Sequence, residues 1–108
     1  MNKSEIASEF RKLKHVLVWS FGDKRRLRSG AKNFLDNVIL HECGELWFIE
    51  IKMDYTGDKF TPGQLLTREL LRKTEQMTNG IVKYRLVNEF NYQDIIQEVN
   101  NCTANNIL

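Results

Sequence analysis

The pattern of apolar and polar positions along the chain predicts three helices and four strands. In the first helix, Ile6, Phe10 and Leu13 recur at helical spacing and form one apolar stripe, with Ser4 as the expected cap. Short runs rich in β-branched and aromatic residues predict the four strands, at residues 15–20, 34–40, 46–53 and 81–87.

A long helix is predicted between the third and fourth strands. Thr61 can cap it, Pro62 suits the first helical position, and Gln64 completes a capping box. Apolar and charged residues then alternate faces at helical period, and the pair Asn79-Gly80 is a typical helix end. Gln64 is therefore expected to cap the helix, whatever else it does.

The last predicted element is a short amphipathic helix over residues 91–99, capped by Asn91, and residues 101–108 are expected to fray. The order α-β-β-β-α-β-α, with a hairpin in the middle and a crossover through the long helix, predicts a mixed α/β fold. Its central mixed sheet should be flanked by helices on both faces. The length of 108 residues fits a single domain over residues 1–108.

The hairpin between the second and third strands fixes which side chains face each other. Residues 42–44 suit a three-residue loop, because Gly44 occupies the third position, where a left-handed conformation is needed. This loop places His41 opposite Glu45. Each further facing pair then lies one residue earlier on the first strand of the hairpin and one residue later on the second.

In that register Asp36 lies directly opposite Glu50, and strand alternation places Lys52 on the same face as Glu50. The apolar residues expected beside them in the core are Val38, Leu40, Leu46 and Phe48. Two buried carboxylates this close repel each other, and a divalent cation such as Mg²⁺ or Mn²⁺ would compensate for the repulsion. The alternative is an ordinary ion-pair cluster on a solvated sheet edge.

Positive charge is concentrated in one stretch of the chain. The formal net charge is only +2, but eight of the 16 basic residues lie in residues 11–32, beside a single acid, Asp23. A local cluster of this kind can bind a polyanion even when the whole molecule is nearly neutral. The residues predicted to contact phosphates are Lys24, Arg25, Arg26, Arg28 and Lys32, in a polar loop, with Thr67, Arg68 and Arg72 of the long helix as further candidates.

Other sequence features limit the location and the core. Cys43 and Cys102 show no metal-ligand spacing, so free thiols in a reducing cytosol are expected. The N-terminus is too charged for a signal peptide, and no apolar run approaches the ~18 residues of a membrane span. A cytoplasmic protein with no membrane partner is therefore predicted. Trp19 and Trp47 are expected in the core.

At these residues the sequence resembles a known superfamily. Asp36 followed by Glu50-Ile51-Lys52 is similar to the PD-(D/E)XK nuclease pattern, although Leu35 stands where that pattern usually has proline. The stretch FIEIKMDYTGDKFTPGQ resembles the virus-type replication-repair nuclease (VRR-NUC) domain, in which a short glycine-containing loop and a Ser/Thr-Pro-x-Gln helix start follow the Glu-x-Lys strand. The resemblance covers residues 30–87 and implies a restriction-endonuclease-like core.

The resemblance also implies roles for individual residues. Asp36 and Glu50 would bind Mg²⁺ or Mn²⁺, with the main-chain carbonyl of Ile51 as a third ligand. Lys52 would act at the attacking water, and Gln64 would reach the site from the start of its helix. Family members often add an acidic residue from the first helix. Glu9 is the first candidate for this position and Glu5 the second.

The implied activity is a DNA endonuclease that leaves 5′-phosphate ends. Domains of this size in the family resemble Holliday-junction resolvases, which implies a homodimer acting on branched or structured DNA and an origin in a phage or mobile element. Two alternatives remain: a non-catalytic nucleic-acid-binding module on the same fold, and a small protein-interaction subunit whose acidic and basic residues form an ion-pair cluster.

Overall fold

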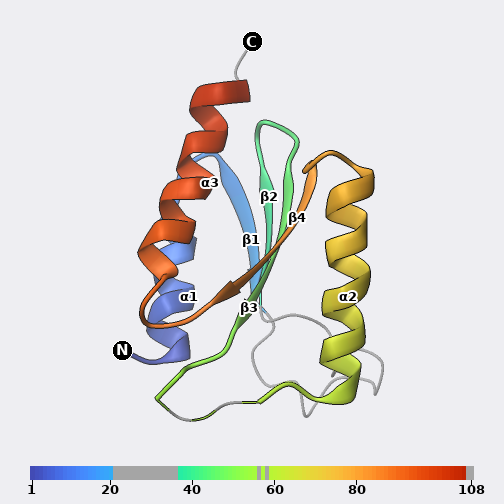
Figure 1. Ribbon diagram of the computed structural model, residues 1–108. Helices are drawn as coiled ribbons and strands as arrows, with labels where there is room; N and C mark the ends of the chain where they lie inside the picture. The colour runs from blue at the N-terminus through green and yellow to red at the C-terminus, as the bar shows by residue number, and fades with distance from the viewer. Residues whose placement is uncertain (21–36, 56, 58, 107–108) are drawn as a thin grey trace.

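The computed structural model describes residues 1–20, 37–55, 57 and 59–106, with the backbone alone for Ser20 and residues 102–106. The predicted order of elements is confirmed (Figure 1). The helices and strands are α1 (Lys3–Arg11), β1 (Val16–Ser20), β2 (Asn37–His41), β3 (Leu46–Ile51), α2 (Pro62–Met77), β4 (Val82–Val87) and α3 (Tyr92–Asn106). The last helix thus continues beyond its predicted end at Val99, and whether the tail frays stays a prediction.

The four strands form one mixed sheet in the order β1-β2-β3-β4. The first three are antiparallel neighbours, and β4 runs parallel to β3 after the crossover through α2. The hairpin register is the predicted one, since Val38 pairs with Phe48 and Asn37 with Ile49. Gly44 has a φ of 95°, which is the left-handed turn position that favours glycine.

Helices cover the two faces of the sheet unequally. Of the helices in the described residues, α1 and α3 lie on one face and α2 lies on the other, where it packs against β4 (Figure 1). The side chains that pack against α1 and α3 are almost completely buried and form the main core, which is Ile6, Phe10, Ile39, Trp47, Ile49, Ile51, Met53, Val87 and Val99. The main core is therefore on the face with two helices.

The predicted core lies on the opposite face, and that prediction is wrong for most of its members. Val38 is buried, but Leu46 and Phe48 are only half-buried and Leu40 is exposed. Trp19, on β1, is 48% exposed, whereas Trp47 is fully buried as predicted. Because the helix on this face packs against β4, apolar side chains on the far strands stay accessible.

The helix starts follow local capping chemistry. Thr61 caps α2 and shares a capping box with Gln64, as predicted. The cap of α1 is Asn2 and not Ser4, because Asn2 and Glu5 form the reciprocal capping box two residues earlier than expected. Glu5 is thereby committed to the start of its helix. Among the described helices none has the length and apolarity to cross a membrane.

Cys43, in the turn between β2 and β3, differs from expectation, and the neighbouring His41 at the end of β2 is buried. Cys43 is disulfide-bonded, so the prediction of a free thiol is wrong for this residue. His41 is 3% exposed, and its Nδ1 accepts a hydrogen bond from the Cys43 backbone N–H at 2.9 Å. Burial lowers the pKa of His41, opposed by the nearby Glu45 and Glu42 carboxylates.

His41 should make stability depend on pH. Burial disfavours the protonated imidazole in the folded state, whereas the unfolded chain takes up the proton near the ordinary pKa of about 6.5. The stabilisation is thus present above pH ~6.5 and is lost as the pH falls below it. The side chain of His41→Asn can still accept the hydrogen bond from the Cys43 N–H, but it does not titrate in this range. When the pH is lowered from about 7.5 to 5.5, the midpoint of thermal unfolding should therefore fall less in this variant than in wild type. An equal fall in both proteins would contradict this prediction.

Candidate functional site

Glu50 and Lys52 lie where β3 ends, on the face of the sheet that α2 covers. Ile51, between them, points into the core on the other face and is 1% exposed. The Glu50 side chain is fully buried, and the Lys52 side chain is 10% exposed. Strand alternation therefore delivers the two charged groups to the same small volume, as predicted.

Gln64 joins the two charged groups to the start of α2. Its Nε2 donates to Glu50 Oε1 at 3.2 Å, and its Oε1 accepts from Lys52 Nζ at 3.0 Å. The same Oε1 accepts from the Thr61 N–H at 3.0 Å, which is half of the capping box. Gln64 thus caps the helix and contacts the site at once, so the two interpretations of this residue are compatible.

The Lys52 ammonium group is held from several sides. Besides Gln64, it donates to the main-chain carbonyl of Lys59 at 3.0 Å and lies 3.7 Å from Glu50 Oε1. Its Nζ is also 5.2 Å from the centre of the Phe60 ring. Buried charges need paired charges and hydrogen bonds to offset desolvation, and Lys52 has both. The ammonium group is therefore fixed beside the carboxylate.

Phe60 is the site residue that sequence reasoning missed. It lies in the connection between β3 and α2, directly before the cap Thr61. An isolated aromatic residue immediately before a capping box is typical of a hydrophobic staple, and this signal could have identified it. Here its ring contacts two cations, Lys52 and Arg68, at 5.2 and 5.3 Å.

Two groups of predicted site residues lie outside the described part of the chain. One is Asp36, although the confirmed register reaches the neighbouring pair Asn37 and Ile49. Its position opposite Glu50 stays a prediction. The other group is the set of predicted phosphate contacts, Lys24, Arg25, Arg26, Arg28 and Lys32.

The structure does not bring the first-helix acids to this site. α1 packs on the face opposite Glu50, because its buried Ile6 and Phe10 belong to the core with Ile51. Glu5 is in the capping box, and Glu9 forms an ion pair with Lys12 at 2.9 Å. The geometry gives no support to Glu9 or Glu5 as metal ligands.

The donors present fit a divalent cation only in part. In the described ranges no three His, Cys, Asp or Glu side chains cluster as a metal site. Glu50 supplies one buried carboxylate, and the main-chain carbonyl of Ile51 remains the predicted oxygen ligand beside it. The predicted ligand set therefore depends on Asp36 as the second carboxylate.

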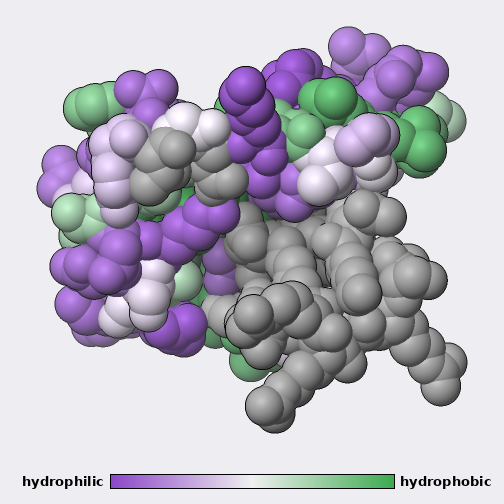
Figure 2. All heavy atoms as spheres, turned by 90° about the horizontal axis from the view of Figure 1, so that it is seen from below, coloured by the Kyte–Doolittle hydropathy of each residue, from purple (hydrophilic) through white to green (hydrophobic). Residues whose placement is uncertain are grey.

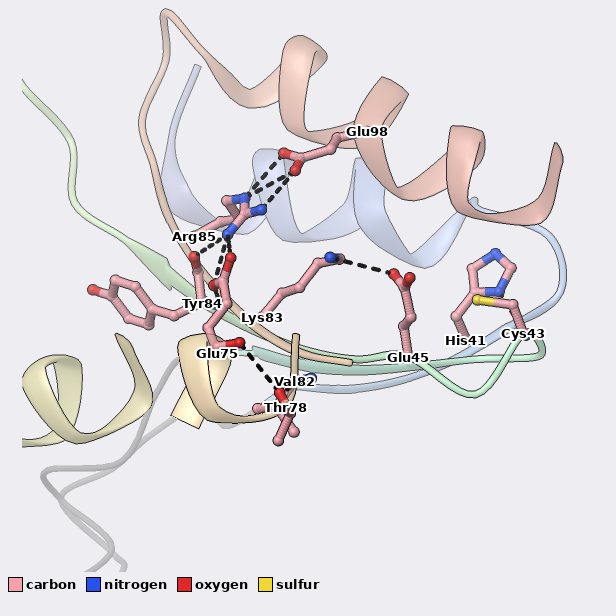
Figure 3. Close-up of polar contacts among 10 residues, drawn as sticks. All are labelled: His41, Cys43, Glu45, Glu75, Thr78, Val82, Lys83, Tyr84, Arg85 and Glu98. Carbon is pink, nitrogen blue, oxygen red and sulfur yellow. Dashed lines mark hydrogen bonds and ion pairs between the residues drawn. The ribbon is translucent and has the colours of Figure 1, made fainter. Parts of the chain in front are cut away.

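A second charged cluster lies at β4, one of the two edge strands of the described sheet. Arg85 Nη1 donates to Glu75 of α2 at 3.0 Å, and its Nη2 donates to Glu98 of α3 at 2.7 Å (Figure 3). Hydrogen bonding to Glu98 is the main cause that raises the pKa of Arg85. Because the two helices cover opposite faces, this cluster ties them together around the sheet edge, and its role is structural.

The described surface at the end of the molecule near the β3–α2 connection, viewed from below, is mostly hydrophilic, with smaller hydrophobic patches (Figure 2).

The chain matches no family model, no curated protein and no solved structure. Function must therefore be inferred from the site itself.

Proposed function

We propose that this protein is a metal-dependent DNA endonuclease with a restriction-endonuclease-like core. The observation that carries the proposal is the buried contact set of Glu50, Gln64 and Lys52. The Glu-x-Lys of a strand and the glutamine of the following helix start meet in space, as the resemblance to PD-(D/E)XK nucleases requires. Asp36 would be the second carboxylate ligand of Mg²⁺ or Mn²⁺.

Each residue would have a distinct task in hydrolysis. When bound, the divalent ion would polarise a phosphoryl oxygen and lower the pKa of a water molecule. The Lys52 ammonium group, fixed by Gln64 and the Lys59 carbonyl, is placed to stabilise negative charge that develops on the phosphate. Gln64 holds the Glu50 carboxylate and the Lys52 ammonium group in a fixed relative position.

Burial argues against an ordinary ion-pair cluster. That alternative places Glu50 and Lys52 on a solvated edge, but Glu50 is 0% exposed. A buried ion pair contributes little net stability, because desolvation offsets the attraction between its charges. Retaining one at the end of a strand favours a chemical role over a purely structural one.

Metal binding should be visible in both stability and activity. A ligand that binds only the folded state stabilises it by about 2.7 kcal/mol at a hundredfold excess over Kd. We therefore expect Mn²⁺ to raise the midpoint of thermal unfolding and to allow cleavage of at least one labelled substrate among a four-way junction, a flap and a plain duplex. No midpoint shift and no cleavage would contradict the proposal.

The substrate panel also separates the remaining possibilities. Preference for the junction, together with a dimeric mass in solution, would support the proposed homodimer on branched DNA, since a two-fold dimer presents two sites to two strands. Salt-sensitive DNA binding without metal dependence would instead favour the non-catalytic binding module. A cytoplasmic location and a phage origin belong to the same proposal, although disulfides such as that of Cys43 are rare in reducing compartments.

A further inference from the structure

Two arginines of α2 differ from Lys73, the other cation of that helix. Arg68 and Arg72 lie one helical turn apart, and within the described residues neither forms an ion pair with a carboxylate. Lys73, by contrast, forms an ion pair in which its Nζ lies 3.6 Å from Glu69 Oε1. The positive charge of the two arginines is thus not neutralised by a carboxylate of this part of the chain.

Each of these two guanidinium groups lies over a different aromatic ring. Arg68 Cζ lies 5.3 Å from the centre of the Phe60 ring, and Arg72 Cζ lies 5.9 Å from that of the Tyr84 ring. An arginine stacked on a ring keeps the N–H groups at its edge available for bidentate contact with a phosphate. Each guanidinium group therefore lies over its own ring, one helical turn from the other.

The arginines line a surface that can accommodate an extended ligand. Arg68, Arg72 and Gln76 border one hollow of about 520 Å³, whose lining residues all belong to α2 and include the Glu69–Lys73 ion pair. Arg72 and Gln76 also border a neighbouring hollow of about 550 Å³ that reaches Tyr84. The two hollows therefore adjoin along the helix, with Arg72 between them.

The Phe60 ring connects this surface to the candidate site. Both Arg68, from this surface, and Lys52, from the candidate site, lie over the Phe60 ring, and the Lys52 Nζ is 5.2 Å from the centre of the ring. Lys52 in turn lies 3.7 Å from Glu50. A row of phosphate groups bound along α2 would thus lead toward Lys52 and the site that contains Glu50.

We propose that Arg68 and Arg72 form a phosphate track, which binds successive phosphates of a nucleic-acid backbone and guides the strand toward Lys52. This inference rests on the proposed function and names the binding path to its site. The contacts are to phosphates, so the track contributes affinity without reading sequence.

The test measures how Kd for a labelled DNA duplex depends on salt, by fluorescence anisotropy in EDTA so that no metal-dependent cleavage occurs. Each lost phosphate contact lowers the slope of log Kd against log salt by about 0.9. Arg68→Gln and Arg72→Gln should each reduce this slope by about one and weaken binding about tenfold at low salt. Arg68→Lys should keep most of the slope, because it keeps the charge.

Lys12→Gln is the matched control, because Lys12 is the C-cap of α1, which covers the opposite face of the sheet, and the substitution removes the same charge. It should leave both slope and Kd close to wild type. If the arginine variants bind as wild type does, or if Lys12→Gln loses as much, the phosphate track is wrong while the nuclease proposal stands. If wild type itself neither binds nor cleaves DNA, the proposed function fails and the track fails with it.

Discussion

Glu50→Gln should abolish Mn²⁺-dependent cleavage of DNA, with a fall in rate of at least about a thousandfold. The substitution replaces the one described carboxylate of the site by an amide of the same shape and weakens its hold on the metal. Loss of several kcal/mol of transition-state stabilisation corresponds to that factor, because each 1.36 kcal/mol is about tenfold in rate. The measurement is single-turnover cleavage of whichever labelled substrate wild type cuts.

The fold should survive this change. The amide oxygen of the new side chain can still accept from Gln64 Nε2, and Lys52 keeps its hydrogen bonds to Gln64 and the Lys59 carbonyl. Glu42→Gln is the matched control, because Glu42 is exposed in the β2–β3 turn, at the opposite end of β3 from the site. Retained cleavage in Glu50→Gln, or equal loss in Glu42→Gln, would reject Glu50 as a metal ligand.

Trp47→Ala should destabilise the protein by about 3–5 kcal/mol, as truncation of a buried large side chain does. The Trp47 ring is fully buried, and it lies under the charged ends of Lys83 and Arg85 at 5.5 and 5.4 Å. The variant loses core packing and both cation–ring contacts. Equilibrium unfolding in urea measures the change in the free energy of unfolding.

Trp19→Ala supplies the comparison within the same sheet. Trp19 is 48% exposed on the same face of the sheet as Phe48, so its removal should cost less than about 1 kcal/mol. The difference between the two tryptophans thus measures which face carries the core. Equal destabilisation by both variants would mean that the Trp19 side chain is packed as tightly as the Trp47 side chain on the opposite face of the sheet.

Local sequence signals determined the elements and one register. The capping box of Thr61 and Gln64 set the start of α2, and Gly44 set the turn between β2 and β3. The length of this turn then fixed the pairing of Val38 with Phe48, because the loop length of a hairpin sets which residues of its two strands face each other. These features depend on residues close together along the chain, so they could be predicted without a structure.

The assignment of faces was beyond the sequence. Both faces of the β2–β3 hairpin carry apolar residues, so alternation could not tell whether Val38 and Phe48 or Ile39 and Trp47 form the core. The number of helices on each face decided it, and that depends on how α1 and α3 return to the same side of the sheet. The same long-range packing removed Glu9 from the side of Glu50.

The candidate site shows the same division. The sequence by itself determined that Glu50 and Lys52 share one face of β3, since strand geometry alone requires it. The resemblance implied that Gln64 reaches this site, but only the tertiary structure decided that Phe60 and the Lys59 carbonyl also surround Lys52, because the crossover must first bring the start of α2 onto the end of β3. Contacts between elements far apart in the chain follow from packing, whereas contacts within an element follow from its period.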